Sequence, residues 1–192
     1  MITGVKRAKS VAVLTVLSMS FAAAACSSDA KSETPAGASS TDTATGLIKG
    51  VKSYSGLSRN HTTDPVTYPQ SPPVGGDHDP VWQNCGVYDE PIKNEHAVHS
   101  MEHGAVWITY RPDLPAAQIA VLAGFAVNQS HILVSPYPGL NSAVVVTAWG
   151  VQLSLESVVD PRLAQFVAEY QEGPQTPELG VTCSGGFGDP IA

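Results

Sequence analysis

The sequence contains few charged residues and especially few basic ones. Charged side chains make up 14% of the 192 residues, and 10 Lys and Arg against 17 Asp and Glu give a formal net charge of -7. A protein with this charge repels phosphate backbones and anionic lipid headgroups. We therefore expect no nucleic acid among its partners.

The chain also lacks a hydrophobic run long enough to be read as a membrane-spanning helix. The apolar run over residues 11–25 is shorter than the ~20 residues that such a helix needs. Basic residues precede it and small residues lead into Cys26, which is typical of an export signal over residues 1–25.

Cys26 stands where a bacterial lipobox places its lipidated cysteine, although Ala23 occupies a position that is usually Leu or Val. We expect a lipid anchor on Cys26 that holds the protein in the membrane, on the outer, extracytoplasmic face of the cell. Ordinary cleavage and secretion is the alternative.

Large apolar side chains are missing from residues 27–46, which consist mainly of Ser, Thr, Ala, Gly and Pro with a few charged residues. Such a segment cannot bury enough surface to offset the entropy cost of ordering it. We assign residues 26–50 to the lipidated cysteine and a flexible tether, and residues 51–192 to a single domain.

Cysteine is scarce, with 3 in the chain. If Cys26 is lipidated, Cys85 and Cys183 remain, and an even pair in an exported domain predicts a disulfide. The alternative is that Cys85 is a metal-binding thiolate, which would leave Cys183 as a free thiol.

The two halves of the domain differ in how closely Pro and Gly residues are spaced. Closely spaced Pro and Gly residues in 54–91 exclude long helices and strands, so we expect a long ordered N-terminal loop region, and long ordered loops usually build a site. The second half predicts strands at 105–110, 131–135, 143–148 and 151–155, and helices at 115–127 and 161–171. This order predicts an α+β fold: a small mixed or antiparallel sheet with helices on one face, and an antiparallel hairpin formed by 131–135 and 143–148.

Histidines are concentrated in the loop region and just after it. The densest group directly precedes the first predicted strand and comprises His96, His99, Glu102 and His103. If residues 95–103 form a helix, His99 and His103 lie four apart on one face, a spacing that metal sites use repeatedly, and Met101 turns into the core. An extended segment would instead place Met101 beside both histidines and favour copper.

Two histidines from the loops, His61 and His78, are able to complete a site. We expect His61, His78, His99 and His103 to bind a transition metal, copper or zinc, with Glu102 and His96 as outer neighbours. The alternative is a structural network in which hydrogen-bonded histidines join the loops to the sheet. The five-residue pattern from His99 to His103 also has the form of an inverted zinc-protease motif, but Gly104 cuts short the helix that a protease needs.

Several motifs carry a family resemblance. They are the segments 66–69, 72–78, 86–91, 98–106 and 110–112, together with Trp82. Over about residues 60–170 the chain resembles the domain-of-unknown-function 3105 family of exported actinobacterial (lipo)proteins. The resemblance implies a site at His61, His78, His99, Glu102 and His103, without naming a reaction. Gly76 and Cys85 depart from the family pattern. Because Cys85 is one of these departures, a disulfide at Cys85 would be a feature of this chain and not of the family.

The leading hypothesis is a lipid-anchored protein whose histidine-rich metal site serves in binding, sensing or delivery. One rival is a metal-dependent hydrolase in which Glu102 acts as the base. The other is a metal-free envelope interaction module, in which His99 and His103 would lie more than ~7 Å from His61 and His78. The sequence does not indicate a protein partner.

Overall fold

The computed structural model describes residues 48–192, so the predicted leader, Cys26 and most of the tether lie outside the described residues. The strands are β1 (Lys52–Ser53), β2 (Gly86–Val87), β3 (Val106–Tyr110), β4 (Ile132–Pro136), β5 (Val144–Ala148) and β6 (Val151–Leu155). The helices are α1 (Asn94–Glu102), α2 (Ala116–Ala123), a 3₁₀ turn (Gly124–Ala126) and α3 (Pro161–Tyr170). Within residues 48–192, no helix is long and apolar enough to cross a membrane.

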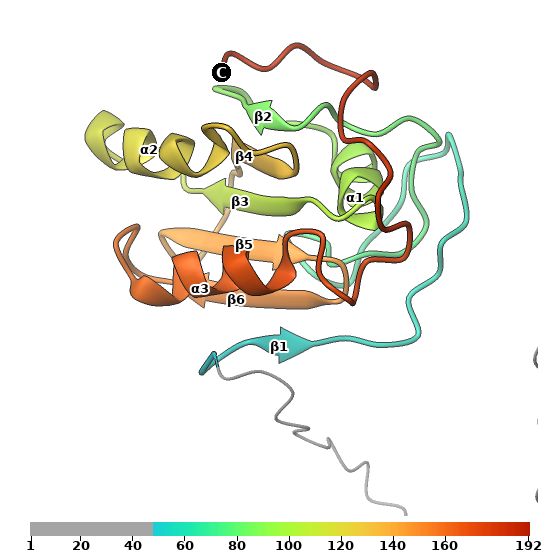
Figure 1. Ribbon diagram of the computed structural model, residues 1–192, viewed down its shortest axis with the longest axis horizontal. Coiled ribbons are helices and arrows are strands. Elements are labelled where there is room, and N and C mark those ends of the chain that lie inside the picture. Colours follow the sequence, from blue (N-terminus) through green and yellow to red (C-terminus); the bar gives the residue numbers. More distant parts are fainter. Residues whose placement is uncertain (1–47) are drawn as a thin grey trace, which may run out of the picture. The chain divides into compact units, whose positions relative to one another are not determined.

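The strands form one mixed sheet in the order β1-β6-β5-β3-β4-β2 (Figure 1). Strand β3 pairs in parallel with β4 and antiparallel with β5, so the predicted α+β class with a mixed sheet is confirmed. The predicted hairpin between β4 and β5 is wrong, because β3 lies between them. Helix α2 supplies the crossover that two parallel strands require, and the chain after β4 then passes to the far side of β3.

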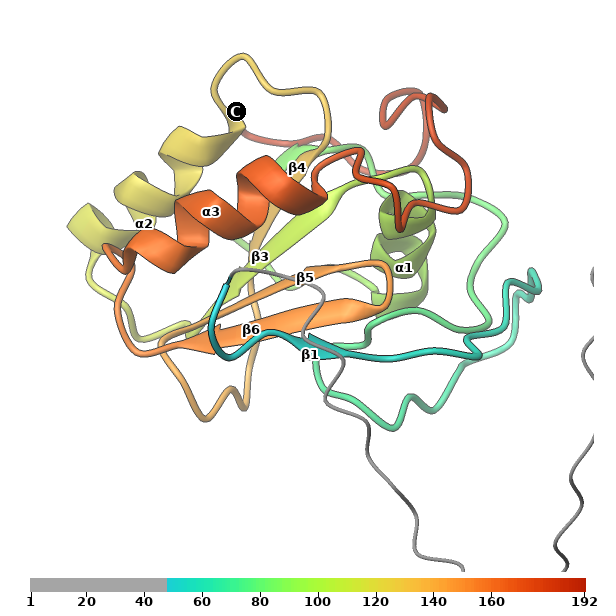
Figure 2. The same ribbon diagram turned by 60° about the horizontal axis from the view of Figure 1, so that its bottom comes forward.

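Helices cover both faces of the sheet. Val106 and Ile108 of β3 pack in the same cluster as Phe166 of α3, whereas Trp107, between them, packs with Met101 of α1. Helices α2 and α3 share one face, as predicted, but α1 lies on the opposite face (Figure 2). Because every residue of β3 is buried, this strand needs cover on each side.

Helix α3 begins where the sequence predicts. Asp160 accepts a hydrogen bond from the main-chain N–H of Arg162 at 2.9 Å, and Pro161 occupies the first turn of α3. Leu163 and Phe166 of this helix are fully buried. At the other end of the domain Ile48, which the sequence-based boundary places in the tether, is buried in the same core.

A disulfide joins the residue before β2 to the C-terminal segment. The Sγ atoms of Cys85 and Cys183 are 2.01 Å apart, and the main-chain N–H of Cys85 donates to the carbonyl oxygen of Cys183 at 2.8 Å. The predicted pairing is confirmed, and the alternative role of Cys85 as a metal thiolate is wrong, because its sulfur is already bonded.

Candidate metal centre

Helix α1 carries the histidine-rich segment and ends immediately after Glu102. The helical interpretation of this segment is therefore confirmed, and Met101 is fully buried in the core. Gly104 ends the helix with a φ of +106°, and a Cβ on it would lie 3.1 Å from the Cα of Glu172. Glycine at this position allows both the left-handed backbone and the close approach of a neighbouring segment.

The long loop region places two more histidines beside α1. His61 and His78 face each other across an isolated parallel bridge, in which Thr62 N–H donates to His78 O at 2.7 Å and His78 N–H donates to Asn60 O at 3.0 Å. A glycine pair just before His78 turns the chain, and Gly76 has a φ of +116°. Backbone hydrogen bonds therefore fix both histidines relative to each other.

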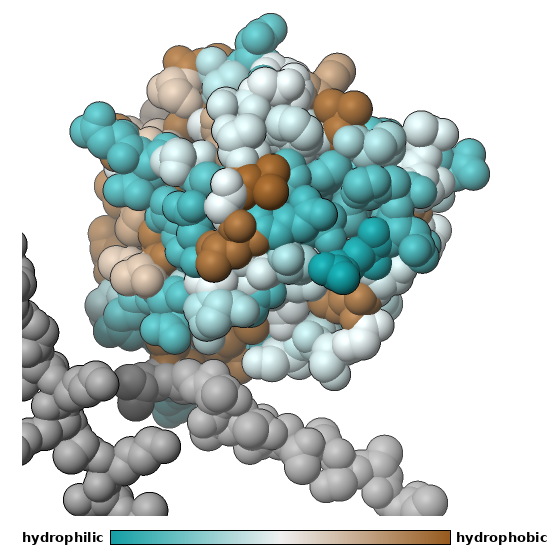
Figure 3. All heavy atoms as spheres, turned by 45° about the vertical axis from the view of Figure 1, so that its right-hand side comes forward, coloured by the Kyte–Doolittle hydropathy of each residue, from teal (hydrophilic) through white to brown (hydrophobic). Residues whose placement is uncertain are grey.

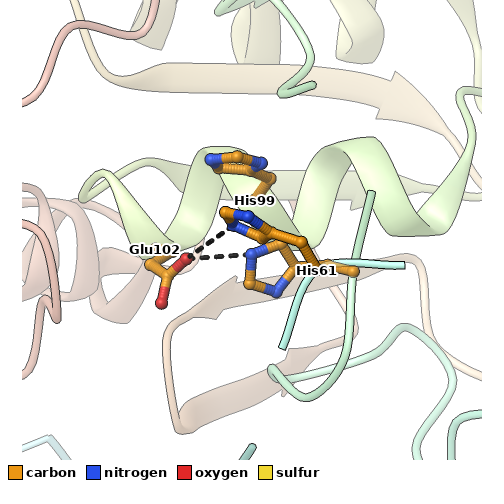
Figure 4. A group of neighbouring side chains, drawn as sticks. His61, His99 and Glu102 are labelled. Atoms are coloured by element: carbon orange, nitrogen blue, oxygen red, sulfur yellow. Dashed lines mark ion pairs between the residues drawn. The ribbon is translucent and has the colours of Figure 1, made fainter. Parts of the chain in front are cut away.

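Three imidazole rings and one carboxylate meet at this point (Figure 4). Ring centroids are 4.8 Å apart for His78 and His99, and 4.9 Å apart for His61 with either of them. One ligand atom each from His61, His78, His99 and Glu102 lies within 4.8 Å of the others. We call these four residues the inner group.

The inner group is buried except at one end. His78, His99 and Glu102 are 0%, 4% and 2% exposed, whereas the side chain of His61 is 47% exposed. The side of the molecule that carries α1 and the loops is mainly hydrophilic with scattered apolar groups (Figure 3). Of the four residues, His61 is therefore the one that faces solvent.

Hydrogen bonds to main-chain carbonyls fix the tautomers of the buried histidines. Nδ1 of His78 lies 2.8 Å from Gly76 O, and Nδ1 of His99 lies 2.6 Å from Asp79 O. A carbonyl oxygen accepts but never donates, so each Nδ1 carries the proton. In the neutral ring Nε2 then presents a lone pair, which is how proteins orient metal-binding histidines.

The contact between His78 and Glu102 brings two atoms with lone pairs close together. Nε2 of His78 lies 2.9 Å from Oε2 of Glu102, yet within the described residues this buried nitrogen has no hydrogen-bond partner. Two electron-rich atoms this close repel each other unless a proton or a metal cation lies between them. The residues present therefore fit a bound cation.

Burial favours the neutral form of His99 and His103. It lowers the pKa of His99 to about 4, against a hydrogen bond to Asp79 O that raises it, and the neighbouring histidines lower it further. Burial also lowers the pKa of His103 and raises the pKa of Glu102, the latter against the attraction of His78. Near pH 7 His99 and His103 thus offer unprotonated nitrogens, as metal ligands must.

A family model described as a protein of unknown function (DUF3105) matches residues 60–185, which is more than half of the chain. The chain belongs to the DUF3105 family. No curated protein and no solved structure matches it. The residues matched to DUF3105 include every member of the inner group.

In this DUF3105 domain the predicted ligands divide between two groups. His61, His78 and His99 meet as predicted, but the fourth member is Glu102, which the sequence analysis places in an outer role. His103 instead lies with His99 and Glu178, whose ligand atoms are also within 4.8 Å of one another. We call these three residues the outer group.

The remaining histidines lie outside both groups. Nδ1 of His96 donates to Val81 O, and its ring stacks on Phe187 with centroids 4.8 Å apart. His131 lies 2.9 Å from Val181 O through its Nε2, so it is structural. Nδ1 of His96 also lies 3.6 Å from Oδ1 of Asp79, the residue whose carbonyl oxygen orients His99, and the outer role of His96 stays a prediction.

Sequence reasoning missed Glu178. It lies in a segment without helix or strand, far along the chain from α1, and no spacing pattern relates it to His103. The structure brings the two together because the main-chain N–H of Glu178 donates to Glu102 O, at the end of α1, at 3.0 Å. Its carboxylate then lies 3.6 Å from Nε2 of His103.

Proposed function

We propose that this domain binds one transition-metal ion, copper or zinc, at the inner group of His61, His78, His99 and Glu102. The observation that supports this most strongly is the 2.9 Å approach of His78 Nε2 to Glu102 Oε2, with Nδ1 of the same ring facing Gly76 O. In the neutral ring the proton lies on Nδ1 and Nε2 directs its lone pair at the carboxylate, an approach that a cation between the two atoms would stabilise. Three imidazoles and a carboxylate suit zinc and copper alike.

We further propose that the protein works outside the cytoplasm, attached to the membrane by a lipid on Cys26. The predicted export signal and the cysteine after it support this location, and so does the Cys85–Cys183 disulfide, because disulfides persist mainly in oxidising compartments. The half-exposed His61 favours a role in metal binding, sensing or delivery, since an ion held there is reachable from solution.

Metal content tests the proposal. The purified protein is incubated with excess Zn²⁺ or Cu²⁺, passed over a desalting column and assayed for metal and protein. We expect about one ion per chain for the wild type and, for His78→Gln, a loss in affinity at least as large as the roughly 10–100-fold that follows when only a partner of a ligand is removed. His131→Gln is the matched control, because it removes a similarly buried histidine whose Nε2 lies against a carbonyl. Equal metal content in all three proteins would refute the proposal.

A metal-dependent hydrolase is the second candidate, favoured by a cavity of about 290 Å³ that Arg59, Trp149 and Pro177 help to line. Nε of Arg59 lies 4.0 Å from Oε1 of Glu102, and the raised pKa of Glu102 suits a group that transfers protons. Zinc-loaded protein would then hydrolyse p-nitrophenyl acetate or p-nitrophenyl phosphate, and Glu102→Gln would lower the rate about 100-fold or more. Rates equal to that of free zinc would exclude activity on such esters.

A further inference from the structure

His99 belongs to both the inner and the outer group, but only one of its ring nitrogens is available. Nδ1 is held by the carbonyl oxygen of Asp79 at 2.6 Å, which leaves Nε2. A single lone pair binds one metal ion at a time. His99 is therefore able to serve the two groups in turn but not simultaneously.

The outer group is built as a ligand set in its own right. Nδ1 of His103 donates to Thr182 O at 2.8 Å, so Nε2 of this buried ring is also free of its proton. It lies 3.6 Å from Oε2 of Glu178. Two imidazole nitrogens and a carboxylate oxygen match the three protein ligands of many zinc sites.

The exposure of the carboxylate distinguishes the outer group from the inner one. The side chain of Glu178 is 45% exposed, whereas that of Glu102 is 2% exposed. The rings of His99 and His103 are 4.6 Å apart, so an ion bound near Glu178 is already beside the ligand that both groups share. A solvent-reached carboxylate attracts cations and speeds their capture.

We propose that His99, His103 and Glu178 form a second metal position through which the ion enters and leaves the inner group. The ion keeps its bond to Nε2 of His99, while His103 and Glu178 are exchanged for His61, His78 and Glu102. The rings of His99 and His103 carry their protons on Nδ1, against main-chain carbonyl oxygens, so at these two rings the exchange only breaks and forms bonds to the metal. This inference rests on the proposed function and extends it to the route of metal transfer.

The test is the rate of zinc transfer, with Zn²⁺ as the probe. Wild type, Glu178→Gln and Glu156→Gln are loaded with Zn²⁺, and transfer to a chromogenic chelator is followed by stopped flow, as is uptake by the metal-free proteins. We expect Glu178→Gln to slow both uptake and release about tenfold. Glu156→Gln removes an equal charge from an exposed position at the end of β6 and should match the wild type.

A second variant isolates the outer position. His61→Gln combined with His78→Gln removes two inner ligands, and we expect it to retain one Zn²⁺ per chain with about 100-fold weaker affinity. Adding Glu178→Gln to this variant should abolish the remaining binding.

Three results would overturn the proposal in distinguishable ways. Unchanged transfer rates in Glu178→Gln would show that zinc passes directly by the exposed His61, and would leave the inner site standing. Two Zn²⁺ ions per wild-type chain would show that the positions are filled together. A wild-type protein that binds no zinc would refute this inference and the proposed zinc site alike.

Discussion

The carbonyl oxygen of Thr182 accepts the Nδ1 proton of His103 at 2.8 Å, and the next residue is Cys183, which is bonded to Cys85. The disulfide therefore fixes the segment that orients one of the candidate metal ligands. Covalent and polar contacts thus act together here, since the bond limits how far the Thr182 carbonyl moves from α1.

Replacing both cysteines by serine should lower stability and loosen this segment. The disulfide closes a loop with a sequence separation of 98, and loss of such a bond typically lowers the free energy of unfolding by about 2–5 kcal/mol. Urea unfolding of Cys85→Ser/Cys183→Ser beside the wild type measures this. An unchanged midpoint and slope would show that the C-terminal segment is held by its hydrogen bonds alone.

Zinc should stabilise the folded protein through the inner group. A ligand that binds only the native state adds about 2.7 kcal/mol to the free energy of unfolding when its concentration is 100 times Kd. Thermal unfolding with and without Zn²⁺ should show a higher Tm that a chelator reverses. His78→Gln should lose most of this shift while His131→Gln keeps it; a shift of the same size in both would place the ion elsewhere.

Acid should weaken the metal-free fold through His99. Its pKa is lowered to about 4 in the folded protein and lies near ~6.5 in the unfolded chain. Between these values the unfolded state binds more protons, so this contribution to stability falls as the pH decreases from 7 to 4.

The variant His99→Gln isolates that contribution, because glutamine does not titrate and Glu102 remains in both proteins. The free energy of unfolding of the wild type minus that of the variant should decrease by about 1–3 kcal/mol from pH 7 to pH 4. A difference that stays constant with pH would show that His99 is protonated in the folded protein at the same pH as in the unfolded chain.

Any side chain at Gly104 should destabilise the end of α1. Alanine there must adopt a φ of +106° and bring its Cβ to 3.1 Å from Glu172 Cα. Gly139 has a φ of +84° with nothing within 4 Å of the added Cβ, so Gly139→Ala carries only the backbone cost of about 1–2 kcal/mol. Denaturant unfolding should show a larger loss for Gly104→Ala, and equal losses would mean that the neighbouring segment moves away freely.

Local chemistry made much of this fold predictable from the sequence. The runs of β-branched residues in β3 and β5, and the Asp160-Pro161 start of α3, lie within single segments and depend on neighbours in the chain. Strand pairing depends on contacts between distant segments. For that reason the sequence predicted a β4–β5 hairpin, although β3 separates these two strands. Which face a helix covers also depends on distant packing, and α1 was misplaced for that reason.

The candidate site divides in the same way. Helical spacing predicted that His99 and His103 share a face, and glycines before His78 indicated a loop that approaches another element. The carbonyls that orient the rings, Asp79 O and Thr182 O, leave no trace in residue type because every residue has a carbonyl. Their role, and that of Glu178, became visible only with the tertiary contacts.

The most direct test of the account is the anomalous diffraction signal of crystals grown with Zn²⁺ or Cu²⁺, recorded at the absorption edge of that metal. The inner group predicts a peak about 2.0–2.2 Å from nitrogen atoms of His61, His78 and His99 and from an oxygen atom of Glu102. A fully occupied peak at any other place on the domain, or no peak at these residues in crystals soaked to saturation, would contradict it.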